Sequence, residues 1–102
     1  MSDIIYHITT RAEWVTAQVN GFYEAPSLHS EGFIHCSEAR QVAGVLQRYF
    51  KGKGPLVKLV IGTEKLHARL QQDFSPSMNE HFPHVYGRIN LDAVIGEEPL
   101  SQ

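Results

Sequence analysis

Apolar and polar residues alternate with a period of two along several short segments of this chain, which is the pattern of half-buried β-strands. In the first of these segments, Ile4 to Thr9, the side chains of His7 and Thr9 share one face. The longest apolar run, Leu56 to Gly62, is interpreted as a central strand. Strands are predicted at residues 4–9, 33–37, 56–62, 68–74, 82–87 and 93–97.

Two helices are predicted between the early strands. Thr10 and Glu13 have the spacing of a capping box, in which the two side chains close the first turn of a helix, and Gly21 ends that helix. A second helix is predicted from about Glu38 to Phe50, because apolar residues recur there at helical spacing, and Ser37 is expected to be its N-cap.

The remaining segments are punctuated by turn residues. Phe22 to Ser30 contains Pro26 and shows no period, so we expect a loop that carries Tyr23 over a ligand. A single helical turn is expected from Thr63 to Leu66. Because the helices do not alternate regularly with the strands, the predicted class is α+β, with a mainly antiparallel, split sheet and two helices.

Composition narrows the function classes. The chain has 102 residues, of which 42% are hydrophobic and 20% charged, as expected for one folded domain spanning residues 1–102. A formal net charge of −2 provides no basic field for bulk nucleic-acid binding. No apolar run is long enough to span a bilayer, the N-terminus does not resemble a signal peptide, and Cys36 is the only cysteine, so we expect a cytoplasmic protein without a membrane partner.

Histidines occur in three of the predicted strands, as His7, His35 and His84. Burying an unpaired polar ring costs on the order of 1–3 kcal/mol, so each imidazole must find a partner or face a cleft. For any single histidine, a bond to a backbone carbonyl that closes the core is at least as good an explanation. Three such strands together favour a site, although no complete catalytic signature is present.

The side chains that share faces with these histidines would form a wall of neutral donors and acceptors, which suits a ribose or a base better than a bare phosphate. The predicted ligand-binding residues are His7, Thr9, Tyr23, Ser37, Tyr86 and Arg88, and the predicted catalytic residues are His35 and His84. His35 is a candidate general acid or base because imidazole titrates near neutral pH.

Other chemistry-bearing residues are assigned simpler roles. Cys36 points away from His35 along the strand and is interpreted as a buried small hydrophobe. His81 and His84 lack the spacing of helical zinc ligands, so no metal is expected. Asp73 and Glu80 are interpreted as solvated loop charges. The alternative is that either of them contributes its carboxylate to the site.

The blocks Tyr6-His7-Ile8-Thr9, Gly32-Phe33-Ile34-His35-Cys36-Ser37 and Phe82-Pro83-His84-Val85-Tyr86-Gly87 resemble a bacterial family catalogued as domain of unknown function 952. The resemblance covers nearly the whole chain and implies a fold similar to that of ADP-ribosyltransferases. The first block looks like the Tyr-His-Gly-Thr strand of the histidine-type transferases, where histidine and threonine bind the ribose and nicotinamide part of NAD. The stretch from Ile34 to Leu66 is similar to RNA 2′-phosphotransferases, whose His-x-Ser strand end matches His35 and Ser37.

The chain also departs from these patterns. Ile8 stands where the transferases have glycine, and the late strand presents His84, Tyr86 and Arg88 where they usually place a glutamate. The leading hypothesis is a domain that binds NAD or another ADP-ribose-containing nucleotide, with ADP-ribosyl transfer as its reaction. The alternatives are a non-enzymatic nucleotide sensor and a structural or partner domain whose histidines only satisfy the core.

Overall fold

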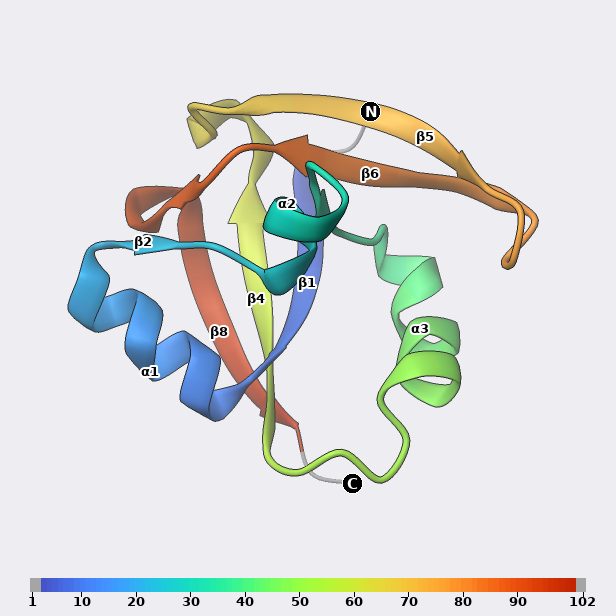
Figure 1. The fold of residues 1–102 in the computed structure, drawn as a ribbon, viewed down its shortest axis with the longest axis horizontal. Coiled ribbons are helices and arrows are strands. Elements are labelled where there is room, and N and C mark those ends of the chain that lie inside the picture. Colours follow the sequence, from blue (N-terminus) through green and yellow to red (C-terminus); the bar gives the residue numbers. More distant parts are fainter. Residues whose placement is uncertain (1–2, 101–102) are drawn as a thin grey trace.

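The computed structural model describes residues 3–100, whose strands form three antiparallel sheets. Figure 1 shows how the longer strands and the helices are arranged. The sheets are β1 (Ile4–Thr10), β4 (Leu56–Gly62) and β8 (Val94–Leu100); β3 (Ile34–His35), β6 (Glu80–Tyr86) and β5 (Arg69–Ser75); and β2 (Phe22–Tyr23) with β7 (Ile89–Asn90). The first two are written in spatial order, so β4 and β6 are the central strands. The α+β class and the split antiparallel sheet are therefore confirmed.

Residues 3–100 contain three α-helices and not two: α1 (Arg11–Asn20), α2 (Pro26–Ser30) and α3 (Val42–Tyr49). The extra helix, α2, lies in the segment expected to be a loop, where Pro26 occupies the first turn of a single short helix. Three-residue 3₁₀ helices cover Ala39–Gln41, Thr63–Lys65 and Leu91–Ala93. Within residues 3–100, none of the helices has the length and apolarity needed to cross a membrane.

The ends of α1 follow the predicted punctuation. The Thr10 side chain accepts a hydrogen bond from the Glu13 backbone at 3.1 Å, and a Glu13 carboxylate oxygen accepts from the Thr10 backbone at 3.4 Å. Gly21 ends the helix in the left-handed region, with φ of 88°. The capping box and the glycine stop are confirmed.

The entry to α3 differs from the prediction. Glu38, not Ser37, is the N-cap, and its backbone N–H donates to the Gln41 side chain at 2.9 Å. The helical segment begins as a 3₁₀ turn, and only Val42–Tyr49 is α-helical. Ser37 is occupied elsewhere, because its backbone exchanges two hydrogen bonds with Tyr6, at 2.7 and 2.8 Å.

The hairpin of β5 and β6 carries the third histidine. Its strands are joined by residues 76–79, and the register pairs Gln71 with His84 and Arg69 with Tyr86. The weakly patterned strand predicted at 68–74 therefore exists. The Phe82–Pro83 peptide bond is trans.

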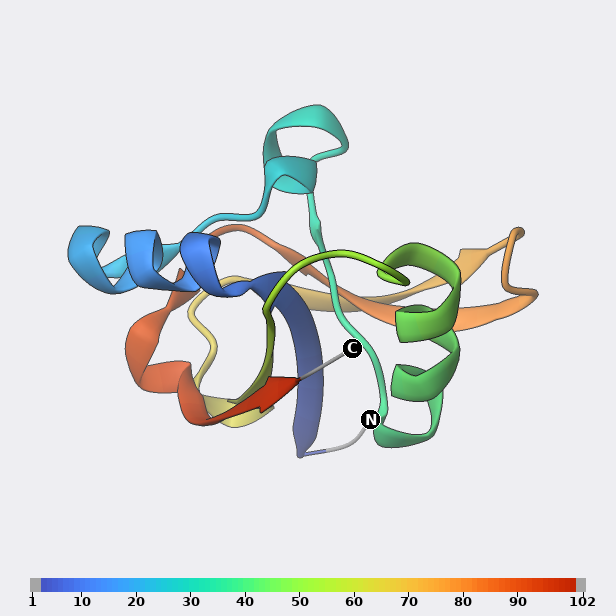
Figure 2. The same cartoon turned by 90° about the horizontal axis from the view of Figure 1, so that it is seen from below.

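The main core fills the space between the sheets and α1. Figures 1 and 2 show α1 and α3 at opposite ends of the fold, with the β5–β6 hairpin across one edge and α2 standing out from the body. The main buried cluster draws on β1, α1, β2, β3, β4 and β6, and includes Ile5, Trp14, Tyr23, Ile34, Leu59 and Val85. Because β3 is part of this core, His35 is attached to a rigid support.

Gly87, which follows β6, is required by close packing. A Cβ atom added there would lie 2.9 Å from the Cβ of Ala68, which is too close for either residue to accommodate without backbone movement. We expect Gly87→Ala to lower the free energy of unfolding by about 1–3 kcal/mol, measured by urea denaturation. Gly54→Ala is the control, because no atom lies within 4 Å of its added Cβ. Equal midpoints for the two variants would contradict the packing argument.

Candidate functional site

Antiparallel pairing of β3 with β6 places His35 directly opposite His84. Their ring centroids lie 5.0 Å apart, with the rings at 76°. Phe33 stacks on His84 at 4.1 Å and 13°, and contacts the rings of His35 and Tyr86 at 4.9 and 5.4 Å. We call Phe33, His35, His84 and Tyr86 the imidazole–aromatic surface.

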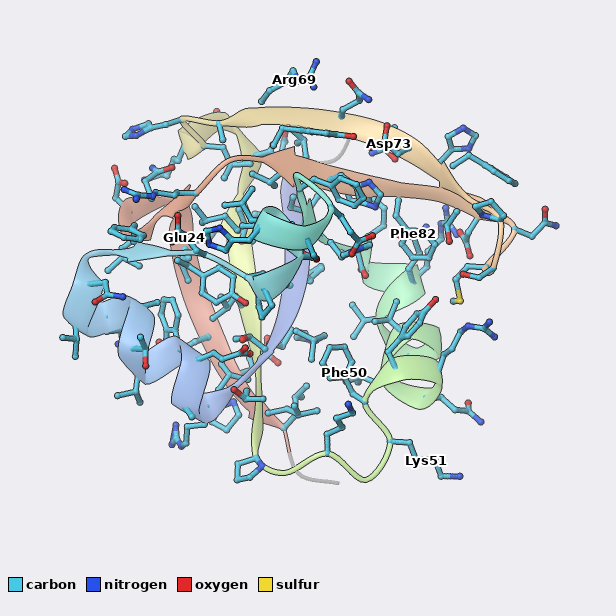
Figure 3. The ribbon with its side chains drawn as sticks, viewed as in Figure 1. Glu24, Phe50, Lys51, Arg69, Asp73 and Phe82 are labelled. Carbon is cyan, nitrogen blue, oxygen red and sulfur yellow. The ribbon has the colours of Figure 1, made fainter. Side chains whose placement is uncertain are left out.

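An aspartate on the neighbouring strand orients His84. The Nδ1 atom of His84 lies 2.8 Å from Oδ2 of Asp73, and the Tyr86 hydroxyl donates to the same oxygen. Gln71 donates to the other carboxylate oxygen at 2.6 Å. Figure 3 shows Asp73 on β5, next to β6. A carboxylate that collects three donors is ionised, so the hydrogen of a neutral His84 lies on Nδ1.

The second nitrogen of His84 faces outward. Within residues 3–100, Nε2 of His84 has no hydrogen-bond partner. Every fully buried side-chain nitrogen or oxygen in this part of the chain has such a partner, so Nε2 is not fully buried and reaches solvent. The side chain as a whole is only 7% exposed. This is the arrangement of an imidazole that accepts a proton through one nitrogen while a carboxylate holds the other.

The electrostatic environment supports the same protonation states. Hydrogen bonds from Tyr86 and Gln71, with a further one from His84, lower the pKa of Asp73 to about 2. Burial lowers the pKa of His84 below its ordinary value, and the bond to Asp73 opposes that shift only in part. At neutral pH the pair is therefore a neutral imidazole beside an ionised carboxylate.

His35 forms a second imidazole–carboxylate pair at the edge of the surface. Its Nε2 lies 2.9 Å from a carboxylate oxygen of Glu31, and both side chains are about half exposed. An exposed contact of this kind contributes at most about 1 kcal/mol to stability. The pair thus orients His35 but leaves the ring accessible to a ligand.

His7, Thr9 and Tyr23 lie beneath this surface and do not line an opening. The His7 Nδ1 atom lies 2.5 Å from the carbonyl oxygen of His35, and Nε2 lies 2.7 Å from the Tyr23 hydroxyl. That hydroxyl lies 3.0 Å from the Thr9 hydroxyl, which donates to Glu13 at 2.8 Å. Every polar side-chain atom of the three is occupied, so the predicted ligand contacts of His7 and Thr9 do not fit this conformation.

The role predicted for Tyr23 is wrong in its geometry. The residue belongs to β2, in the core, and is 1% exposed, so it cannot cover a ligand from a surface loop. Burial raises the pKa of its hydroxyl above the ordinary value. Tyr23 therefore remains a neutral hydroxyl inside the protein.

Ser37 and Arg88 take different positions from those expected. Ser37 is 5% exposed, and its backbone pairs with Tyr6 of β1. Arg88 lies beyond the end of β6, donates to Glu24 at 2.8 Å and stacks over the Phe22 ring at 3.9 Å. Figure 3 shows Glu24 at the connection between β2 and α2, away from Asp73. Arg88 is thus an ion-pair partner and not part of the imidazole–aromatic surface.

The preferred interpretation of Asp73 as a solvated loop charge is wrong, and the alternative, a carboxylate supplied to the site, fits the structure. The available signal was the hairpin register, because pairing Gln71 with His84 puts Asp73 and Gln71 on the same face as His84 and Tyr86. Glu80 is also engaged, since it accepts hydrogen bonds from Arg40 and Gln41. Among residues 3–100, no group of three or more histidine, cysteine, aspartate or glutamate side chains is arranged to hold a metal ion.

Two surface hollows lie elsewhere. One, of about 280 Å³, lies between α1 and β8 and includes Trp14 and Ile95. The other, of about 240 Å³, lies beside α1, β2 and α2 and includes Glu13 and Glu24. The imidazole–aromatic surface lines neither of them.

Comparisons with known proteins agree on a family whose function is unknown. The model of a family described as protein of unknown function (DUF952) matches residues 8–97. The crystal structure of protein CC0527 from Caulobacter crescentus is 32% identical, with a TM-score of 0.87 over 96% of this chain and 86% of that chain. The solution structure of CC0527 is 32% identical, with a TM-score of 0.80 over 95% and 84% of the two chains. A search of curated proteins found no match.

The buried state of His7 predicts a pH dependence of stability. Burial lowers its pKa from 6.5 to about 4. Between these values the unfolded chain binds a proton that the folded chain does not, so the free energy of unfolding falls as the pH falls through this window, by about 3 kcal/mol. We expect the stability difference between the native protein and His7→Gln, measured by denaturation at pH 7 and pH 4, to shrink by that amount. A difference that is independent of pH would contradict a neutral buried His7.

Proposed function

The chain belongs to the DUF952 family, whose function is unknown, and we propose a function from its own geometry: binding of a nucleotide of the NAD and ADP-ribose class at the imidazole–aromatic surface. The observation that carries the proposal is the His84 ring, stacked on Phe33 and held by Asp73, with Nε2 open to solvent. Neutral imidazole and hydroxyl groups beside aromatic rings match the base and ribose parts of such a ligand.

The charges around the surface indicate how the rest of the nucleotide is bound. The guanidinium of Arg69 lies over the Tyr86 ring at 4.5 Å and provides a positive charge beside the rings for a diphosphate. Arg88, which the sequence predicts as a ligand-binding residue, instead donates to Glu24. His7 and Thr9 support the surface from below, through the carbonyl of His35, and do not contact the ligand.

His84 and His35 are the catalytic residues of this proposal, which treats the reaction as ADP-ribosyl transfer. The bond from the ribose C1′ to nicotinamide breaks, nicotinamide leaves with the bonding electron pair, and the acceptor oxygen forms the new bond to C1′. Nε2 of His84 takes the proton that the acceptor hydroxyl loses. His35, opposite His84, orients the acceptor or the ribose.

A non-enzymatic sensor is the second candidate, and a specific contact favours it. The Asp73 carboxylate accepts hydrogen bonds from Tyr86, Gln71 and His84. A carboxylate already occupied by three donors is poorly suited to polarise a ribose hydroxyl, which is the role that glutamate has in the transferases that the sequence resembles. In the sensor, the surface binds the nucleotide and no bond is broken.

The first test is binding. Calorimetric titration of the protein with NAD and with ADP-ribose is expected to show saturable binding, and His84→Gln is expected to weaken it about tenfold, the effect of losing one good polar contact. His67→Gln is the matched control, because His67 is exposed and lies outside the surface. Absence of binding by the native protein would remove both candidates and leave a structural or partner domain.

The second test is turnover. We expect the native protein to release nicotinamide from NAD, measured by chromatography. The rate of release is expected to fall about 10²–10⁴-fold in His84→Gln, the usual contribution of a general base. Asp73→Asn removes the ionised partner of Nδ1 and is expected to reduce the rate more than the affinity. Binding of NAD with no release by the native protein would contradict the enzyme and support the sensor.

A further inference from the structure

A buried chain of hydrogen-bonding groups runs from the surface of α1 to the backbone beneath His35. Its members are Glu13, Thr9, Tyr23, His7 and the His35 carbonyl, and its successive contacts measure 2.8, 3.0, 2.7 and 2.5 Å. Thr9 and Tyr23 are each 1% exposed. Glu13, at the other end, lines the hollow beside α1, β2 and α2 and so meets solvent.

The chain has four contacts but three hydrogens. A carbonyl oxygen and an ionised carboxylate only accept, whereas a neutral imidazole, a tyrosine hydroxyl and a threonine hydroxyl each supply one hydrogen. The His35 carbonyl fixes the hydrogen of neutral His7 on Nδ1. Nε2 of His7 then accepts from Tyr23, and Thr9 donates to Glu13.

In the neutral state one of these contacts lacks a hydrogen. The single hydrogen of the Tyr23 hydroxyl can go either to Nε2 of His7, 2.7 Å away, or to the Thr9 hydroxyl, 3.0 Å away, and not to both at once. A proton added to Nε2 of His7 would complete the chain, because the Tyr23 hydroxyl would then turn from His7 to Thr9. All four contacts would hold a hydrogen, with a positive imidazole at one end and a negative carboxylate at the other.

We propose that Glu13, Thr9, Tyr23 and His7 form a proton-accepting chain, in which one added proton reverses the Tyr23 hydroxyl and places a positive charge directly behind the peptide of His35. This inference goes beyond the proposed function, since it needs no ligand. The chain lies next to the site, because the His7 ring bonds the carbonyl of His35, whose side chain is part of the imidazole–aromatic surface.

The groups around His7 are consistent with uptake of a single proton. The titratable groups that face it or its Tyr23 partner are Glu13 from α1, Tyr23 from β2, His35 from β3, and Cys36, which follows β3. On β4 the paired residue is Leu59, which is apolar. Burial, the largest effect, lowers the pKa of His7 to about 4, and Glu13 acts in the opposite direction. Burial raises the pKa of Cys36, so this thiol stays neutral.

The test is an NMR titration of the His7 ring nitrogens. At pH 7 the native protein is expected to show the neutral ring with its hydrogen on Nδ1. In Glu13→Gln the side-chain amide can donate to Thr9, which completes the chain without an added proton and removes the negative charge. The titration midpoint of His7 is therefore expected to move about one pH unit lower than in the native protein.

The controls separate the chain from general electrostatics and from damage to the fold. Thr9→Val interrupts the chain and is expected to lower the His7 midpoint, whereas Thr9→Ser keeps the hydroxyl and is expected to restore it. Glu24→Gln removes a carboxylate that lines the same hollow but lies outside the chain, and it is expected to leave the midpoint unchanged. An unchanged midpoint in Glu13→Gln, or equal shifts in Glu13→Gln and Glu24→Gln, would overturn the proposal.

Discussion

The segment from Ile34 to Ser37 is the constraint on which the rest of this structure depends. It is too short to be stable alone, so three interactions hold it: Ile34 and His35 pair with β6, Ser37 bridges to Tyr6 of β1, and the His35 carbonyl accepts from His7. The segment thereby joins two otherwise separate sheets. The position of His35 relative to His84 follows from this attachment and not from either side chain.

The three strand histidines have different physical roles. One sequence pattern was therefore consistent both with a functional site and with histidines that only satisfy the core. His7 is the buried histidine whose ring atoms are both satisfied, as the structural explanation required. His35 and His84 meet at the surface, as a site requires. Residue type and alternation are identical in the two cases, and only the neighbouring strand determines whether an imidazole meets solvent or another part of the chain.

Local signals in the sequence were sufficient for the longer strands and for α1, because alternation, the Thr10–Glu13 spacing and Gly21 act over a few residues. They did not reveal the two-residue strands β2 and β7. They failed where a distant partner decides the outcome. Serine is a common N-cap residue, yet the backbone of Ser37 forms hydrogen bonds with that of Tyr6. Asp73 is a charged residue of a kind that usually faces solvent, yet the hairpin places His84 and Tyr86 within hydrogen-bond distance of it. Arg88 was predicted to bind a ligand, yet it pairs with Glu24, which lies 64 positions earlier in the chain.

The turn at residues 76–79 has a consequence for how such a protein can diversify. Exposed turns usually accept insertions and deletions freely. Here Asn79 has φ of 54°, and the turn fixes the β5–β6 register, so one extra residue would move Asp73 to the opposite face of its strand and away from His84. The residue types of this turn can therefore vary, but a homologue that keeps the hydrogen bond between Asp73 and His84 must also keep the length of the turn.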